Sequence, residues 1–158
     1  MKQRASLFFR VVFIILTAAM ITFAFVHSAM PAKISARESG GILDLLYALL
    51  PRLGINLDLT DHIVRKLAHF TEFTAIGMLS TTCAYSFDRF KPYRYIVYVL
   101  FTGMSTAFID ETIQLFSEDR AGMITDVWID FSGVILGTAV MLLFYIIYQR
   151  IRKKMKHE

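Results

Sequence analysis

Four long apolar stretches divide the chain, and most of its charged residues lie between or beyond them. The stretches run from about Leu7 to Ala29, Leu67 to Phe87, Tyr95 to Phe116 and Val127 to Tyr148. Each is long enough to cross about 30 Å of hydrocarbon as an α-helix, which satisfies its own backbone hydrogen bonds. The pattern predicts an all-α fold, a bundle of four transmembrane helices that forms a single domain over residues 1–158.

Composition points the same way. Hydrophobic residues make up 56% and charged residues 19% of the 158 residues. An ordinary soluble domain is about 45–50% apolar and about 25% charged, so a soluble globule and a disordered chain are both disfavoured. The first stretch begins like a cleaved signal peptide. Its uncharged core over residues 11–26 exceeds the usual length of about 7–15 residues, which favours a retained anchor.

A shorter apolar segment lies between the first two long ones. It runs from Gly41 to Leu50, and Pro51 ends it. It is too short to span a bilayer, so we expect a short interfacial helix in the first outer loop.

Lys and Arg residues are distributed unevenly between the connecting segments. The N-terminal segment, the loop after the second stretch and the tail hold eleven, whereas the other connections hold six. Because cytoplasmic loops carry the excess of Lys and Arg, we expect both termini in the cytoplasm, with the protein in a bacterial cytoplasmic membrane. The net charge of +4 is then explained by the basic tail, which is attracted to anionic lipid. No nucleic-acid partner is expected.

Three of the apolar stretches carry polar residues in a repeated 4, 3, 4 spacing, which places each set on one face of a helix. The three sets are Arg65, His69, Glu72 and Ile76; Gly103, Ala107, Asp110 and Gln114; and Asp126, Asp130, Gly133 and Gly137. The Gly133/Gly137 pair is a GxxxG motif, which lets two membrane helices approach closely. With the orientation above, all three polar ends meet on the outer side of the membrane.

We call this predicted convergence the polar mouth. Its members are Lys66, His69, Glu72, Asp110, Glu111, Gln114, Arg120, Asp126 and Asp130. Ionisable groups inside a membrane are costly, so they are functional candidates by default. His69, Glu72, Asp110 and Glu111 are the candidate catalytic residues. Lys66, Gln114, Arg120, Asp126 and Asp130 are the candidate ligand-binding residues.

The acidic residues of the polar mouth outnumber its basic ones, and like charges at short range cannot all stay ionised. Three chemistries fit. Carboxylates and His69 can hold a divalent cation; a carboxylic acid beside His69 can act as general acid and base; or the acids can bind amines while Lys66 and Arg120 bind anionic groups. A structural alternative is that these groups only hold the helices together, at about 0.6 kcal/mol per hydrogen bond. His27, at the end of the first stretch, is expected to be interfacial.

The order of these residues resembles the VanZ-like family of bacterial membrane proteins, the teicoplanin-resistance protein VanZ type. The resemblance rests on the ordered run Lys66, His69, Glu72, Asp110, Glu111, Gln114, Arg120, Asp126, Gly133 and Gly137. It covers about residues 60–140, and the family commonly has Asn where this chain has Asp130. The resemblance implies a multi-pass protein of the bacterial cell envelope, and the namesake is associated with antibiotic resistance to teicoplanin.

The favoured function is recognition, at the polar mouth, of an envelope lipid, a lipid-linked wall precursor or a lipoglycopeptide antibiotic, which lowers antibiotic susceptibility. Two alternatives stay open. One is an intramembrane hydrolase or head-group transferase that uses His69 with Glu72 or Asp110. The other is a small transporter, which would need a homo-oligomer because four helices are few for a carrier.

Overall fold

The computed structural model describes residues 4–53, 60–89 and 91–155. It is 86% helix, and the described residues contain no strand. Five α-helices and two 3-10 turns follow in order: α1 Leu7–Ser28, α2 Ala32–Leu49, η1 Leu50–Leu53, α3 Asp61–Phe87, η2 Pro92–Tyr95, α4 Ile96–Gln114 and α5 Ile124–Lys154.

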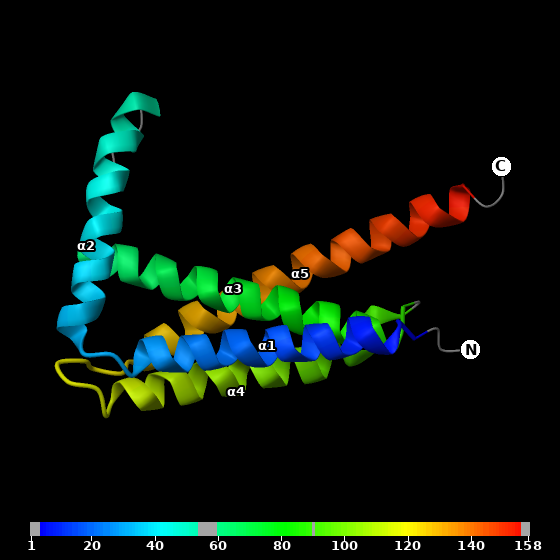
Figure 1. Cartoon of the computed structure of the whole chain (residues 1–158), viewed down its shortest axis with the longest axis horizontal. Helices are drawn as coiled ribbons and strands as arrows, with labels where there is room; N and C mark the ends of the chain where they lie inside the picture. Colours follow the sequence, from blue (N-terminus) through cyan, green and yellow to red (C-terminus); the bar gives the residue numbers. More distant parts are fainter. Residues whose placement is uncertain (1–3, 54–59, 90, 156–158) are drawn as a thin grey trace.

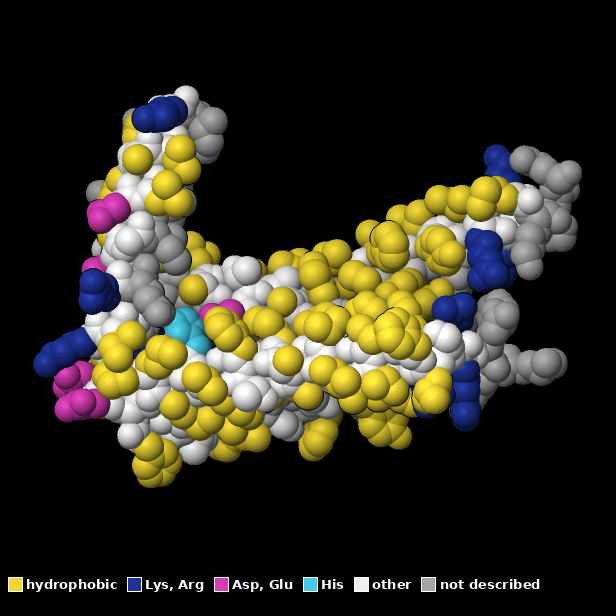
Figure 2. All heavy atoms as spheres, in the orientation of Figure 1, with side chains coloured by type: hydrophobic (Ala, Val, Ile, Leu, Met, Phe, Trp, Pro, Cys, Tyr) yellow, Lys and Arg dark blue, Asp and Glu magenta, His cyan; other side chains and the backbone are white. Residues whose placement is uncertain are grey.

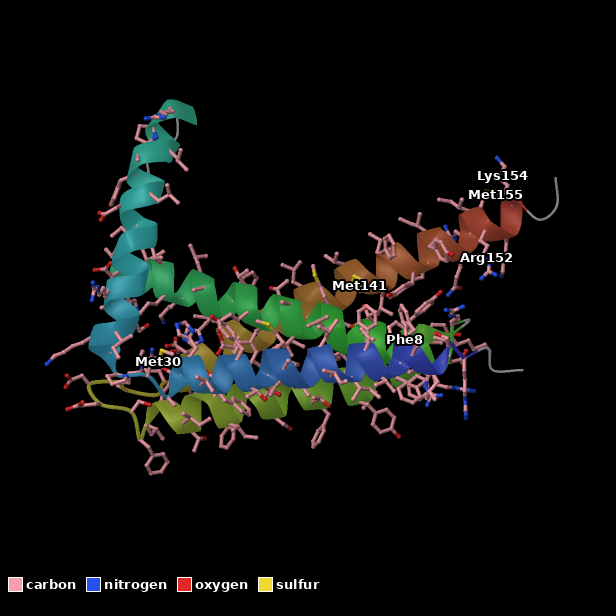
Figure 3. The ribbon with its side chains drawn as sticks, in the orientation of Figure 1. Phe8, Met30, Met141, Arg152, Lys154 and Met155 are labelled. Carbon is pink, nitrogen blue, oxygen red and sulfur yellow. The ribbon has the colours of Figure 1, made fainter. Side chains whose placement is uncertain are left out.

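Helices α1, α3, α4 and α5 pack together, and α3 has its most extensive contact with α5. The C-terminal part of α5 diverges from the other three helices (Figure 1). The four helices alternate in direction, so the N- and C-termini lie at the same end (Figure 1). Phe8 and Arg152 mark that end, and Met30 marks the opposite one (Figure 3). Hydrophobic side chains cover the long sides of the packed helices, while charged side chains gather toward the two ends (Figure 2).

Three of the described helical segments are long and apolar enough to cross a membrane: Leu7–Ser28, Tyr93–Gln114 and Ile124–Lys154. The expectation of a membrane protein is therefore confirmed. Helix α3 has the length, at 27 residues, but falls short in apolarity. Charged side chains in its first half and a run of Ser and Thr in its second half, including Ser80, Thr81 and Thr82, lower its hydropathy.

Several helices begin earlier than the apolar pattern suggests. Helix α2 begins at Ala32 rather than Gly41, because the Pro31 carbonyl accepts hydrogen bonds from the backbone N–H groups of Ile34 and Ser35. It then stands away from the long axis of the packed helices (Figure 1). Helix α3 begins at Asp61, where the Thr60 hydroxyl caps the Ile63 N–H at 3.3 Å.

Helix α5 is longer than expected at both ends, since it starts at Ile124 and continues through the basic tail to Lys154. Three basic residues in its last turn, Arg152, Lys153 and Lys154, stabilise it there because positive charge favours a helix C-terminus.

Close approach of α3 and α5 depends on glycine. A Cβ added to Gly133 would lie 2.6 Å from the Phe70 carbonyl oxygen, and one added to Gly137 would overlap the Thr74 carbonyl oxygen. The GxxxG motif therefore faces α3, as its spacing predicts. Gly77 of α3, which the sequence argument did not single out, faces the backbone of α5 in the same way.

The apolar core lies beside this contact. Its buried members come from all four packed helices and include Ala24, Phe73, Ile76, Ala107 and Val134.

Replacing Gly137 by Ala should lower the free energy of unfolding by about 1–3 kcal/mol, because the added methyl group overpacks the backbone contact. The melting temperature in detergent should fall by roughly 2–4 °C per kcal/mol. Gly41→Ala is the matched control, since a Cβ at Gly41 meets nothing within 4 Å. It should leave stability unchanged or raise it by up to about 1 kcal/mol. Equal effects of the two substitutions would contradict the packing role of Gly137.

Candidate functional site

The polar mouth lies at the end of the packed helices from which α2 departs. Helix α3 brings Lys66, His69 and Glu72; α4 brings Asp110, Glu111 and Gln114; the following loop brings Arg120; and the first turns of α5 bring Asp126 and Asp130. Each helix directs its residues inward because its 4, 3, 4 spacing keeps them on one face. The structure thus gathers all nine predicted residues in one region, although they fall into three separate groups.

The first group joins α1 to α3 and corrects the interpretation of His27. Its Nδ1 lies 2.9 Å from Glu72 Oε1, and its ring stacks on the His69 ring with centroids 5.7 Å apart. His27 is therefore part of the site rather than an interfacial side chain. One signal could have identified it: His27 lies in the last turn of α1, at the same end of the packed helices as the other polar residues.

The second group surrounds Asp110, whose side chain is fully buried. Asp110 Oδ2 accepts hydrogen bonds from the Ser28 hydroxyl at 2.7 Å and from Gln114 Nε2 at 3.2 Å. His69 Nδ1 is 3.8 Å from the same oxygen, which is too long for a hydrogen bond. Ser28 is a second residue that the sequence argument missed, because a lone Ser at a helix end carries no distinctive pattern.

Glu111 uses both carboxylate oxygens within the protein. Oε1 accepts from Gln114 Nε2 at 2.9 Å, and Oε2 accepts from the Met123 backbone N–H at 2.9 Å. Glu111 therefore holds the loop that leads into α5. The geometry favours a positioning role over the catalytic role proposed from the sequence.

The third group is the ion pair of Lys66 with Asp126, at 2.5 Å between Nζ and Oδ1. Lys66 thus pairs with the first turn of α5. Arg120 donates from Nη2 to the His27 carbonyl at 3.5 Å, while its buried Nε has no hydrogen-bond partner. Burial, and then the charge of Arg65, lower the pKa of Arg120 from its usual value.

Two cavities, each of about 220 Å³, open beside these groups. Arg65 and His69 line both. The polar cavity is otherwise lined mainly by polar members of the site, among them Lys66, Gln114, Arg120, Asp126 and Asp130. The apolar cavity is otherwise lined mainly by apolar residues of α1, α3 and the segment after α1, among them Phe23, Val26, Met30, Val64 and Ala68, together with His27 and Glu72.

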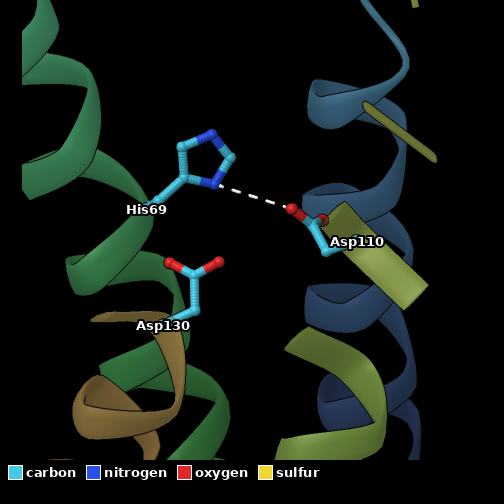
Figure 4. Close-up of side chains that lie close together, drawn as sticks. All are labelled: His69, Asp110 and Asp130. Carbon is cyan, nitrogen blue, oxygen red and sulfur yellow. Dashed lines mark ion pairs between the residues drawn. The ribbon is translucent and has the colours of Figure 1, made fainter. Parts of the chain in front are cut away.

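His69, Asp110 and Asp130 form a potential metal-ligand set between three helices (Figure 4). One ligand atom from each lies within 4.8 Å of the others. Asp130 is 1% exposed, and its Oδ2 has no hydrogen-bond partner. An imidazole nitrogen and two carboxylate oxygens can hold a divalent cation, or the two acids can share a proton.

A family model described as VanZ/LLP1 matches residues 13–146. The chain belongs to this family. The match includes every residue of the polar mouth, and it confirms the resemblance seen in the sequence. VanZ/LLP1 membership and the three apolar helices together make the chain a VanZ-like membrane protein. No curated protein and no solved structure matches it.

Charge substitutions in the polar mouth should have unequal effects on stability. Arg120→Ala removes positive charge from an acid-rich region and should lower the free energy of unfolding by about 1–3 kcal/mol. Glu72→Gln keeps an amide oxygen to accept from His27 and removes one of several repelling charges, so stability should change by less than about 0.5 kcal/mol or rise.

Melting temperatures of the purified variants in detergent measure this difference. Arg150→Ala is the control for loss of an arginine, because Arg150 is exposed near the C-terminus, at the end of the molecule away from the polar mouth. If Glu72→Gln lost as much stability as Arg120→Ala, the residues of the polar mouth would serve mainly to hold the helices together.

Proposed function

We propose that α1, α3, α4 and α5 all cross the bacterial cytoplasmic membrane. The position of α3 supports this proposal, because α3 runs the length of the other three helices and contacts each of them. Its low apolarity does not oppose a crossing. Ser80, Thr81 and Thr82 are buried, so neighbouring helices shield them from lipid.

Helix α2 belongs in the outer interface under this proposal. Its exposed residues Ile34, Leu45 and Leu49 share one face at helical spacing, and the exposed Lys33 lies on a different face. An amphipathic helix of this kind lies in the membrane plane with its apolar face toward the acyl chains. The uneven Lys and Arg distribution supports cytoplasmic termini, which turns the polar mouth outward.

The polar mouth recognises an amphiphile of the cell envelope. The single observation that carries this function is the pair of cavities, one polar and one apolar, that share Arg65 and His69 as a common wall. An amphiphile needs this combination. Its charged head enters the polar cavity, while its hydrocarbon lies along Phe23 and Val26.

Arg65 and Arg120 are suited to bind the anionic group of such a ligand. A guanidinium binds phosphate or carboxylate through a fork of donors, and the Nε of Arg120 has no protein partner. Lys66, which the sequence proposed together with Arg120, is already bonded to Asp126 and serves as a secondary contact. Glu72, Asp126 and other acids would bind amino groups of the same ligand.

The ligand class follows from this chemistry: an anionic envelope lipid, a lipid-linked wall precursor or a lipoglycopeptide. Retention of a lipoglycopeptide, or of its lipid-linked target, at the polar mouth would lower susceptibility to antibiotics of the teicoplanin type. This is the link that family membership suggests for VanZ-like proteins.

An intramembrane hydrolase or head-group transferase is the second candidate. The proximity of His69 Nδ1 to Asp110 Oδ2, at 3.8 Å, favours it, because a positioned imidazole and a carboxylate can exchange protons with a substrate. His69→Ala that retains ligand binding but loses turnover of a radiolabelled lipid-linked precursor would establish catalysis. Retained binding with no turnover in the unmodified protein would exclude it.

The orientation predicts that the loop between α4 and α5 is extracellular. A cysteine at Glu118, in a Cys83→Ser background, should react in intact cells with a membrane-impermeant thiol reagent, because the Glu118 side chain is exposed. A cysteine at Lys153 should react only after the cells are opened. Labelling in the reverse order would overturn the orientation.

The amphiphile site predicts retention of one anionic lipid by the arginines. Native mass spectrometry of the purified protein should show one tightly bound phosphatidylglycerol, with phosphatidylcholine bound at least about tenfold more weakly, a difference of about 1.4 kcal/mol. Arg65→Gln with Arg120→Gln should abolish this retention. Lys153→Gln is the control, since the basic tail attracts anionic lipid without a cavity. Equal loss in both would contradict the site.

A further inference from the structure

Three side chains from three helices lie close together beside the polar cavity: His69 of α3, Asp110 of α4 and Asp130 of α5 (Figure 4). His69 and Asp130 line the cavity. Asp110 and Asp130 are 0% and 1% exposed. Each of the three residues also presents a buried atom with no hydrogen-bond partner: His69 Nδ1, Asp110 Oδ1 and Asp130 Oδ2. The set therefore combines close spacing with unsatisfied polar atoms.

Structural support alone does not explain this arrangement. The bond from Ser28 of α1 to Asp110 Oδ2 can hold two helices together, but it leaves Asp110 Oδ1 and Asp130 Oδ2 without partners. His69 Nδ1, 3.8 Å from Asp110 Oδ2, is also too far for a hydrogen bond. A buried carboxylate without a charge partner costs several kcal/mol. In the described residues, neither Asp110 nor Asp130 forms an ion pair with Lys or Arg, and Lys66 is bonded to Asp126.

We infer that His69, Asp110 and Asp130 bind a divalent cation. One imidazole nitrogen and two carboxylate oxygens form a mixed set that suits Zn²⁺ or Mn²⁺ better than Ca²⁺ or Mg²⁺, which prefer oxygen alone. The cation would supply the positive charge that the two buried carboxylates lack.

The distances are compatible with a single ion. Ligand atoms at about 2.0–2.2 Å from a metal are at most about 4.4 Å from each other. The 3.8 Å separation of His69 and Asp110 falls within this limit, and every separation in the set is within 4.8 Å, close to it.

The surroundings of Asp110 resemble the outer shell of a metal site. Ser28 and Gln114 both donate to Asp110 Oδ2, which fixes the orientation of the carboxylate. Outer hydrogen bonds of this kind orient metal ligands and increase affinity. His69 and Asp130 also line the polar cavity, so the ion would keep a coordination position open toward it.

This inference goes beyond the amphiphile site and does not depend on it. A cation held by His69, Asp110 and Asp130 would lie beside the polar cavity and would bind the anionic head of a ligand directly. The cation can also bind when no such ligand is present. Metal binding and lipid retention are therefore measured separately on the same protein.

The test begins with the full chain, purified in detergent and treated with a chelator. Addition of Zn²⁺ or Mn²⁺ should give one bound ion per chain by elemental analysis and should raise the melting temperature. Mg²⁺ should do neither at the same concentration. Pulsed electron paramagnetic resonance of the Mn²⁺-loaded protein should detect a coordinated imidazole nitrogen from His69.

The decisive comparison uses two Asp→Asn substitutions one helical turn apart on α5. Asp130→Asn should weaken the binding of Zn²⁺ by more than about tenfold, since even outer-shell groups are worth about 10- to 100-fold. Asp126→Asn removes the same charge from the same cavity but lies outside the set, so it should change the affinity by less than about threefold, below the effect of an outer-shell group. His69→Ala should behave like Asp130→Asn.

Three results would overturn the inference. The first is no stoichiometric binding of Zn²⁺ or Mn²⁺ to the wild-type protein. The second is equal weakening by Asp126→Asn and Asp130→Asn, which would show nonspecific attraction to an acidic cavity. The third is the absence of a nitrogen ligand in the Mn²⁺-loaded wild-type protein. This result decides the question if the variants do not fold. If the wild-type protein binds the metal but retains no anionic lipid, only the proposed function is contradicted.

Discussion

The backbone contact between α3 and α5 is the constraint on which the rest of the structure depends. Gly77, Gly133 and Gly137 allow the two helices to approach until backbone atoms of one face those of the other. Nothing larger fits between them, so their rotation and register are fixed. Because His69 and Asp130 lie about one turn beyond this contact, the same fixed register also sets how the two side chains meet.

The apolar core and the polar mouth have opposite energetic requirements. Phe73, Ile76 and Val134 are stabilised by burial alone. Asp110 and Glu111 are buried nearby and need donors or compensating charge to remain there. Ser28, Gln114 and the Met123 N–H supply donors, and together they connect α1, α4 and the start of α5. Hydrogen bonding thus holds together the polar end of the molecule, beside the core member Val127.

These hydrogen bonds also distinguish the roles of residues that look equivalent in the sequence. Glu111 and Asp110 are adjacent, acidic and buried, yet both oxygens of Glu111 are used within the protein, whereas Asp110 keeps one oxygen without a partner. Asp126 and Asp130 differ similarly, since only Asp126 has a lysine partner. Asp110 and Asp130 each keep a buried oxygen without a hydrogen-bond partner among the described residues, and this makes them the stronger candidates for binding.

The sequence alone determined the helical class, the membrane environment, the family and the faces that carry polar residues, because these depend on local composition and on helical spacing. It did not determine which carboxylate pairs with which base, nor that His27 and Ser28 complete the site. Lys66 pairs with Asp126, 60 residues away, and His27 with Glu72, 45 residues away. Such pairs depend on the relative rotation and depth of separate helices, which only the tertiary packing around the glycines decides.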